Sequence, residues 1–391
     1  MTLPEVPDDH LPASALREMR PAYGTGSLAD VLPSVSAVLG VPGATDVLGL
    51  TGRLDGVTRI GVLLVDGLGF HQLPVASAYA PVLADLAAGA GSLTAGFPST
   101  TPVSLATLGT GVVPGAHGIL GFTTRRPDGR NLVHIHWGDD PDPREWQPVP
   151  TRFELAVKAG VRTAAVTRPE FEGSGFTVAT HRGAPIVGAS TGAEVAARLV
   201  ESLAAGPEPA LVYAYYRELD KAGHEDGVDS PSWRAAAADV DAILDRVVHD
   251  LPPRSAVLVI ADHGQLNVPL ADRVNMADIP DLSAGVAGVA GEPRVRYLHV
   301  ADGALADVVA CWQSYFGERA WVLTREQAIA EGLFGAVPAE HAGRIGDVVV
   351  ACRERVIALA TGWEPPSVAG LVAYHGSLTA AEMQIPLLLI R

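Results

Sequence analysis

The chain has 391 residues, of which 48% are hydrophobic and 18% are charged, and its formal net charge is −16 at pH 7. This size and composition predict a globular protein with enough apolar side chains for one large core or two smaller ones. The negative charge argues against stable nucleic-acid binding and against docking on anionic membranes, and two cysteines are too few for a disulfide framework.

The N-terminal segment, residues 1–55, is interrupted by Pro and Gly and contains one helical stretch at 32–39. We expect it to form an arm packed on the core. Its first 24 residues lack the apolar region of a signal peptide, and the chain has no apolar run of transmembrane length. These features predict a cytoplasmic protein that does not enter a membrane.

Residues 56–268 alternate short apolar runs with alanine-rich helical segments. The runs at 60–65, 211–216 and 256–260 are typical of buried strands, and the longest helical segment covers 232–251. Such alternation predicts βαβ units and a mainly parallel sheet. The fold class is therefore α/β.

The pattern changes after about residue 268. Strand-like segments at 295–300 and 321–323 and a predicted helix at 304–315 are enough for a small α+β insert over residues 269–342, which would cap the ends of the preceding strands. We expect the core to resume over residues 343–391. The strands expected there are 347–351, 355–359 and 384–390.

Acidic residues and histidines follow four apolar runs, the fourth of which is 371–374. In a parallel sheet the ligand site lies at the carboxyl ends of the strands, so these side chains should converge on one edge. A cluster of buried carboxylates is costly unless cations neutralise it, and a metal ion would also use the imidazoles. The candidate ligands are Asp66, Asp220, His224, Asp262, His263 and His375.

A group of hydroxyl residues follows Pro98 and precedes a helix-like run from Leu105. Ser99, Thr100 and Thr101 are suitable helix N-caps, and a helix N-terminus favours an anion. A hydroxyl beside a metal ion loses its proton more readily and becomes a nucleophile. Helix capping alone would also explain these residues.

The order of these motifs resembles the alkaline phosphatase superfamily, and within it the nucleotide pyrophosphatase/phosphodiesterase branch. The resemblance spans roughly residues 57 to 391 without the insert and implies a three-layer α/β/α sandwich. Each motif alone is weakly specific, but five in this order are highly specific. They are Val65-Asp66-Gly67, Pro98-Ser99-Thr100-Thr101, Asp220-x-x-Gly223-His224-x-x-Gly227, Asp262-His263-Gly264 and His375-Gly376.

The resemblance implies a binuclear site with two divalent metal ions, zinc being the expected metal. By position in the family motif the nucleophile is Thr101, with the neighbouring Thr100 as the reserve candidate. The nucleophile would attack phosphorus and form a phosphothreonine that water then hydrolyses. The implied ligands are Asp220, His224 and His375 for one ion, and Asp66, Asp262, His263 and Thr101 for the other.

The chain departs from the family pattern at one position. Phosphodiesterases of this branch usually carry an Asn shortly after the nucleophile, and we assign the matching position to Ser104, whose hydroxyl donates one hydrogen bond. Ser104 and Thr100 are therefore the candidate substrate-binding residues. We expect a phosphoester hydrolase that acts on a small phosphodiester or nucleotide pyrophosphate. Phosphomonoesters and phosphonates are the alternatives, because the same metal core serves them.

Another chemistry is suggested by Gly188-Ala189-Ser190-Thr191-Gly192, which matches the nucleophile elbow of serine esterases. Asp262 and His375 follow this serine in the order that such enzymes use. However, the threonine of the motif also forms a capping-box pattern with Glu194, and the esterase hypothesis leaves most candidate metal ligands unexplained. A non-catalytic metal protein with the same fold is a third interpretation.

Overall fold

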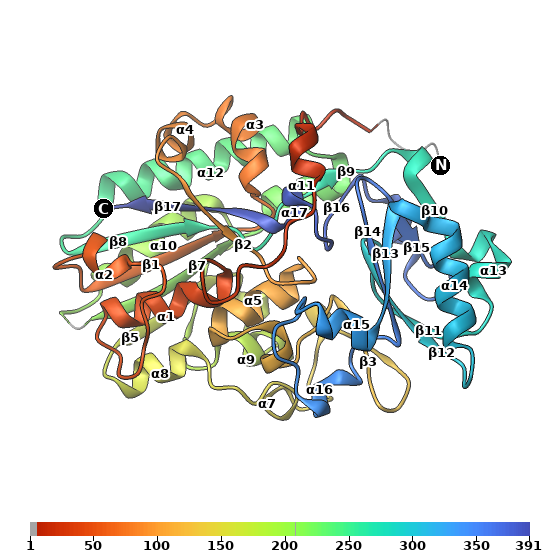
Figure 1. Cartoon of the computed structure of the whole chain (residues 1–391). Helices are drawn as coiled ribbons and strands as arrows, with labels where there is room; N and C mark the ends of the chain where they lie inside the picture. The colour runs from red at the N-terminus through yellow and green to blue at the C-terminus, as the bar shows by residue number, and fades with distance from the viewer. Residues whose placement is uncertain (1–5, 208) are drawn as a thin grey trace.

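The computed structural model describes residues 6–207 and 209–391, which form two unequal lobes, each built around a sheet (Figure 1). The larger sheet has seven strands in the order β2-β17-β8-β1-β7-β5-β6. Its centre is parallel and consists of almost wholly buried apolar runs, as predicted. These central strands are β1 (Arg59–Val65), β7 (Ala210–Tyr216) and β8 (Ser255–Ile260).

The outer strands of the larger sheet differ in direction on its two sides. On one side, β5 (Arg162–Thr167) and β6 (Ile186–Gly188) continue the parallel order. On the other side, β17 (Gln384–Ile390) runs antiparallel to β8, and β2 (Gly91–Thr94) runs antiparallel to β17.

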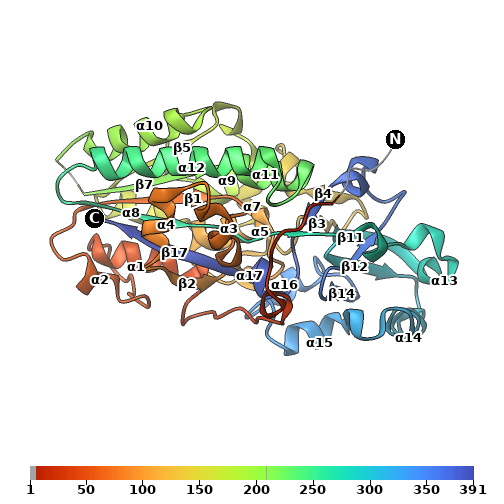
Figure 2. The same ribbon diagram turned by 90° about the horizontal axis from the view of Figure 1, so that it is seen from above.

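Helices cover both faces of the larger sheet, as Figures 1 and 2 show together. The apolar sides of both helical layers pack on the strands in one continuous core, so the predicted three-layer α/β/α sandwich is confirmed. One layer contains α3 (Leu73–Ser77), α4 (Pro81–Ala87), α10 (Gly192–Ala204), α11 (Glu218–Asp226) and α12 (Pro231–Asp250). The other contains α1 (Leu28–Val38), α5 (Thr101–Thr110), α8 (Arg152–Lys158) and α9 (Gly175–His181).

The smaller lobe contains a four-stranded antiparallel sheet in the order β11-β12-β14-β13, which we call the small sheet. Helix α14 (Leu305–Phe316) packs on it through Trp312 and Phe316, and α13 (Pro280–Ser283) and α15 (Arg325–Ala330) lie beside it. The strands of the small sheet are β11 (Val286–Glu292), β12 (Val295–Val300), β13 (Ala320–Thr324) and β14 (Val348–Cys352).

Two predicted core strands belong elsewhere. Strand β14 pairs with β12 and β13, and β15 (Ile357–Leu359) pairs with β10 (Arg273–Asn275), so neither returns to the larger sheet. The apolar run of β14 is buried on both faces of the small sheet, and an apolar run does not reveal which sheet it joins.

The run at 371–374 also lies outside the larger sheet. Only β16 (Ala373–Tyr374) forms a pair, antiparallel to β9 (Leu266–Asn267). The expected fourth parallel strand is therefore wrong, although the residue that follows it reaches the same site. Within the described residues, no helix combines the length and the apolar character needed to cross a membrane.

Candidate active site and metal centre

The carboxyl ends of β1, β7 and β8 lie side by side, because β1 pairs with both of the other strands. Asp66 directly follows β1, and the pair Asp262-His263 follows β8 after one residue. Asp220 and His224 lie one turn apart on α11, which follows β7. His375 reaches the same place from the loop after β16. The structure thus brings together all six candidate ligands.

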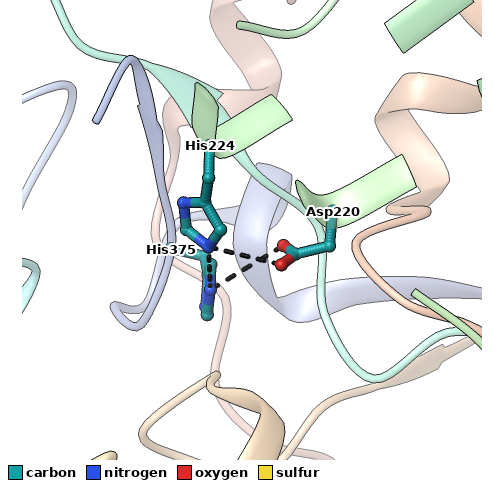
Figure 3. A group of neighbouring side chains, drawn as sticks. All are labelled: Asp220, His224 and His375. Carbon is teal, nitrogen blue, oxygen red and sulfur yellow. Dashed lines mark hydrogen bonds and ion pairs between the residues drawn. The ribbon is translucent and has the colours of Figure 1, made fainter. Parts of the chain in front are cut away.

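One group of three side chains lies between α11 and this loop (Figure 3). The Nε2 atom of His224 is 3.4 Å from Asp220 Oδ2 and 3.2 Å from the Nε2 atom of His375. Each imidazole donates its Nδ1 hydrogen to a backbone carbonyl, that of Ala373 for His224 and that of Ser99 for His375. The two Nε2 atoms are therefore the ring nitrogens left free to accept, and they face each other. A cation between them would satisfy both.

A second group adjoins the first. It consists of Asp66, His263 and the same Asp220. The Nε2 atom of His263 is 3.6 Å from Asp66 Oδ1 and 3.3 Å from Asp262 Oδ2. The rings of His263 and His375 stack with centroids 3.5 Å apart, so the two groups are in contact.

Electrostatics in this cluster favour bound cations. Burial, with repulsion from Asp262 and Asp220, raises the pKa of Asp66 well above its ordinary value, and burial also raises that of Asp262. Asp66 Oδ1 and Asp262 Oδ2 are buried and have no hydrogen-bond partner within the described residues. Buried carboxylates without partners are costly. Nitrogen and oxygen donors in this arrangement fit divalent metal ions.

The candidate nucleophile lies at the start of α5. Thr101 is the first residue of this helix, and its Oγ1 atom is 3.1 Å from His263 Nε2. Thr100, the N-cap residue, is buried, and its Oγ1 atom has no partner within the described residues. Ser104 is also buried, but its hydroxyl donates a 2.8 Å hydrogen bond to the carbonyl of Asp262. Ser104 therefore helps to hold the loop after β8, and its role in substrate binding stays a prediction.

Comparison with known proteins agrees with this geometry. The family model described as type I phosphodiesterase / nucleotide pyrophosphatase matches residues 61–378, most of the chain. The chain belongs to this family. The family is part of the alkaline phosphatase superfamily, as the motif order predicted.

A curated relative of this family is known in Schizosaccharomyces pombe, where it is described as an uncharacterized pyrophosphatase/phosphodiesterase. It is 28% identical over 178 residues, which are 43% of this chain and 36% of that protein. The matched region thus spans about a third of the curated relative's length.

Solved structures share the fold of this family member. Murine ectonucleotide pyrophosphatase / phosphodiesterase 5 aligns with a TM-score of 0.67 and 19% identity over 84% of this chain and 87% of that one, and an inactive variant of it has been solved in complex with AMP. Phosphonoacetate hydrolase from Sinorhizobium meliloti 1021 aligns with a TM-score of 0.64 and 19% identity over 86% and 91% of the chains.

Two residues outside the motifs donate hydrogen bonds to candidate ligands and hold them in place. Gln265 donates through its side-chain amide to the carboxylate of Asp220 and, at 3.0 Å, to its backbone carbonyl. The hydroxyl of Tyr215 donates to Asp66 Oδ2. Gln265 directly follows the Asp262-His263-Gly264 motif, and Tyr215 is the second-last residue of β7. These positions are the only signals for the two residues in the sequence.

Two cavities meet at the site. The first, of about 290 Å³, lies beside α9 and is bordered by Thr101, Phe171 and Tyr215; we call it the α9 cavity. The second, of about 340 Å³, is bordered by His224 and His375 and by residues of the small sheet; we call it the small-sheet cavity. The insert thus forms one wall of a cavity at the candidate ligands.

The serine of the esterase-like motif lies away from this site. Ser190 is exposed in the loop between β6 and α10, and its backbone N–H donates to Glu194. Thr191 and Glu194 form the expected capping box. Strand β6 is an edge strand, and three strands separate it from β8, which leads to Asp262. The esterase hypothesis therefore has no geometric support.

Proposed function

We propose that this chain is a metal-dependent phosphodiesterase that uses Thr101 as its nucleophile. One arrangement carries the proposal. The hydroxyl of Thr101 lies 3.1 Å from His263 Nε2, at the N-terminus of α5 and beside two adjoining ligand groups that share Asp220. A nucleophile, an anion-binding helix terminus and cation ligands are the parts that in-line displacement at phosphorus requires.

The ligand types favour two divalent ions, with zinc as the expected metal. We assign Asp220, His224 and His375 to one ion, and Asp66, Asp262 and His263 to the other with the Thr101 hydroxyl. When bound, such ions lower the pKa of an attacking hydroxyl and stabilise the charge on the oxygens around phosphorus.

The remaining steps, which are orientation of the phosphate and attack on phosphorus, depend on the protein's own groups. The backbone N–H groups at the N-terminus of α5 bind the phosphoryl oxygens, and Thr101, the first residue of this helix, thereby lies beside phosphorus. Thr101 Oγ1 gives its proton to solvent water and bonds to phosphorus. The bond from phosphorus to the alcohol oxygen breaks, and that oxygen takes a proton from water, so the step releases no net proton. Water then hydrolyses the phosphothreonine ester, which restores the free hydroxyl.

The α9 cavity suggests a nucleotide-like substituent on the substrate. Phe171 and Tyr215 place two aromatic rings with centroids 6.5 Å apart in its wall, and aromatic rings are good surfaces for a planar base. AMP is bound in the structure of the murine relative. We therefore propose small nucleotide diesters as substrates, with the small sheet as the cap over the site.

Metal analysis and intact-mass measurement test the proposal. Purified protein should contain about two divalent ions per chain. Thr101→Ala should keep these ions and lose about a thousandfold or more in kcat on a nucleotide diester, whereas Thr101→Ser should keep part of the activity and form an adduct detectable by mass. Full activity of Thr101→Ala, or a folded protein that takes up no metal, would contradict the proposal. A monoester and a phosphonate, assayed in parallel, test the alternatives.

A further inference from the structure

The small-sheet cavity and the α9 cavity border different parts of the site, and Thr100, beside the nucleophile, borders the small-sheet cavity. Thr101 borders the α9 cavity, whereas His224 and His375 border the small-sheet cavity. In an in-line displacement the leaving oxygen departs opposite the attacking oxygen. The group that stays on phosphorus therefore belongs beside Thr101, and the leaving alcohol belongs in the small-sheet cavity.

The small-sheet cavity offers a polyanion no unpaired lysine or arginine among the described lining residues. Arg296 is the only Lys or Arg among the described residues that line it, and its guanidinium is paired with the carboxylate of Glu364. A second carboxyl, that of Glu292, is only 7% exposed, and its Oε1 atom has no hydrogen-bond partner within the described residues. Its other oxygen accepts a 3.0 Å bond from the backbone N–H of Phe122.

The rest of the cavity wall is mainly apolar and aromatic. Phe122, Trp363 and Tyr374 contribute rings to it, and Val289 and Leu371 contribute aliphatic surface. Aromatic faces beside a carboxyl attract cations and hydrogen-bond donors. A pyrophosphate leaving group would instead meet two carboxyls, one imidazole outside the candidate ligands (His136), and no lysine or arginine free of a carboxylate partner among the described lining residues.

We propose that the small-sheet cavity receives the leaving alcohol of the substrate, that Glu292 selects this alcohol, and that the alcohol is neutral or cationic rather than a polyphosphate. This inference rests on the proposed function. It narrows the proposed substrates from nucleotide pyrophosphates and phosphodiesters to phosphodiesters alone. In the reaction Thr101 Oγ1 gives its proton to solvent water and gains a bond to phosphorus, the phosphorus–oxygen bond to the alcohol breaks, and the alcohol leaves with a proton taken from water.

A matched series of substrates tests the inference. The adenosine 5′-phosphate diesters of choline, of 1-butanol and of 4-hydroxybutyrate share one retained group and differ in the charge of the leaving alcohol; ATP supplies a pyrophosphate leaving group. With metal-loaded protein, kcat/KM from the release of AMP should be at least tenfold higher for the choline ester than for the 4-hydroxybutyrate ester, and lowest for ATP.

Variants then assign the selectivity to a residue. Glu292→Gln keeps the shape and the acceptor for Phe122, so it should cleave the butyl ester and reduce the ratio between the choline and 4-hydroxybutyrate esters at least fivefold. Glu170→Gln changes a carboxyl that borders the α9 cavity and should leave that ratio unchanged. Equal rates for ATP and the butyl ester, or an unchanged ratio in Glu292→Gln, would overturn the inference alone. If metal-loaded protein cleaves none of the four compounds, the proposed function fails and the inference fails with it.

Discussion

A buried ion pair connects the small sheet to the loops that carry two candidate ligands. Arg294 lies in the turn between β11 and β12, and Glu382 lies in α17 (Ala380–Met383). Both side chains are 0% exposed, and two parallel hydrogen bonds of 2.8 Å join them. The carboxylate of Glu382 also accepts from Ser377, two residues after His375, and its backbone carbonyl accepts from Gly264, next to His263.

Removal of the arginine should destabilise the protein strongly. Arg294→Met leaves the carboxylate of Glu382 buried without a cation, and breaking a buried pair in this way costs about 3–5 kcal/mol in the free energy of unfolding. The double variant Arg294→Met/Glu382→Gln removes the charge but keeps an acceptor for the N–H of Ser377. It should recover about 1–3 kcal/mol relative to the single variant.

Denaturant unfolding followed by tryptophan fluorescence, with a chelator present in every sample, measures these differences without a contribution from metal binding. The matched control is Arg198→Ala, which breaks an exposed pair with Glu201 on α10 and should change the free energy of unfolding by less than about 1 kcal/mol. A loss of under about 1 kcal/mol in Arg294→Met, or a double variant less stable than the single one, would refute the reasoning.

Three further predictions follow from single residues. His375→Ala should lose about one of the two bound ions by elemental analysis, while the exposed His249→Ala should keep both. Burial, with His341, His134 and Arg344 nearby, lowers the pKa of His117 to about 3, so below pH 6.5 the unfolded chain binds a proton that the folded chain does not. As the pH falls from 6.5 to 4.5, the free energy of unfolding of the wild-type chain should therefore decrease by about 2 kcal/mol through His117, and His117→Gln should not show this decrease. Gly109→Ala on α5 would place a Cβ against the carbonyl of Thr180 on α9 and should cost about 1–3 kcal/mol in unfolding experiments, whereas Gly52→Ala, with no atom near its Cβ position, should change stability little.

The larger sheet was predictable because its strands carry their own signal. The runs that became β1, β7 and β8 are buried on both faces, so they are continuously apolar, and they alternate with long amphipathic helices such as α12. The sequence of a strand carries no comparable signal for which sheet the strand joins. Strands β8 and β14 are both short apolar runs rich in valine, yet β8 pairs with β1 and β14 with β12. That choice depends on contacts between distant parts of the chain.

The candidate site was partly predictable for a related reason. Asp66 follows β1 directly and Asp262-His263 follow β8 after one residue, so the sheet places them together once the strands are known. His375 reached the site by another path, because its short strand lies outside the larger sheet. The argument from parallel strand ends therefore does not explain its position, and the motif order is the signal that still holds. The roles of Gln265 and Ser104 depend on where their side chains point, which no local pattern specifies.

The turn Glu292-Pro293-Arg294 shows why specificity is harder to predict than chemistry. A charged turn after a strand normally faces solvent, and the sequence gives no reason to expect otherwise. Here the small sheet packs against the core, so Glu292 borders the cavity beside the candidate ligands while Arg294 is buried against Glu382. One residue of the turn then selects the leaving group, and another residue two positions away holds the turn in place. Because the two side chains contact different partners, Glu292→Gln should alter selectivity without the loss of stability expected for Arg294→Met. A residue of this turn could therefore change the leaving group that is accepted while the candidate ligands stay in place.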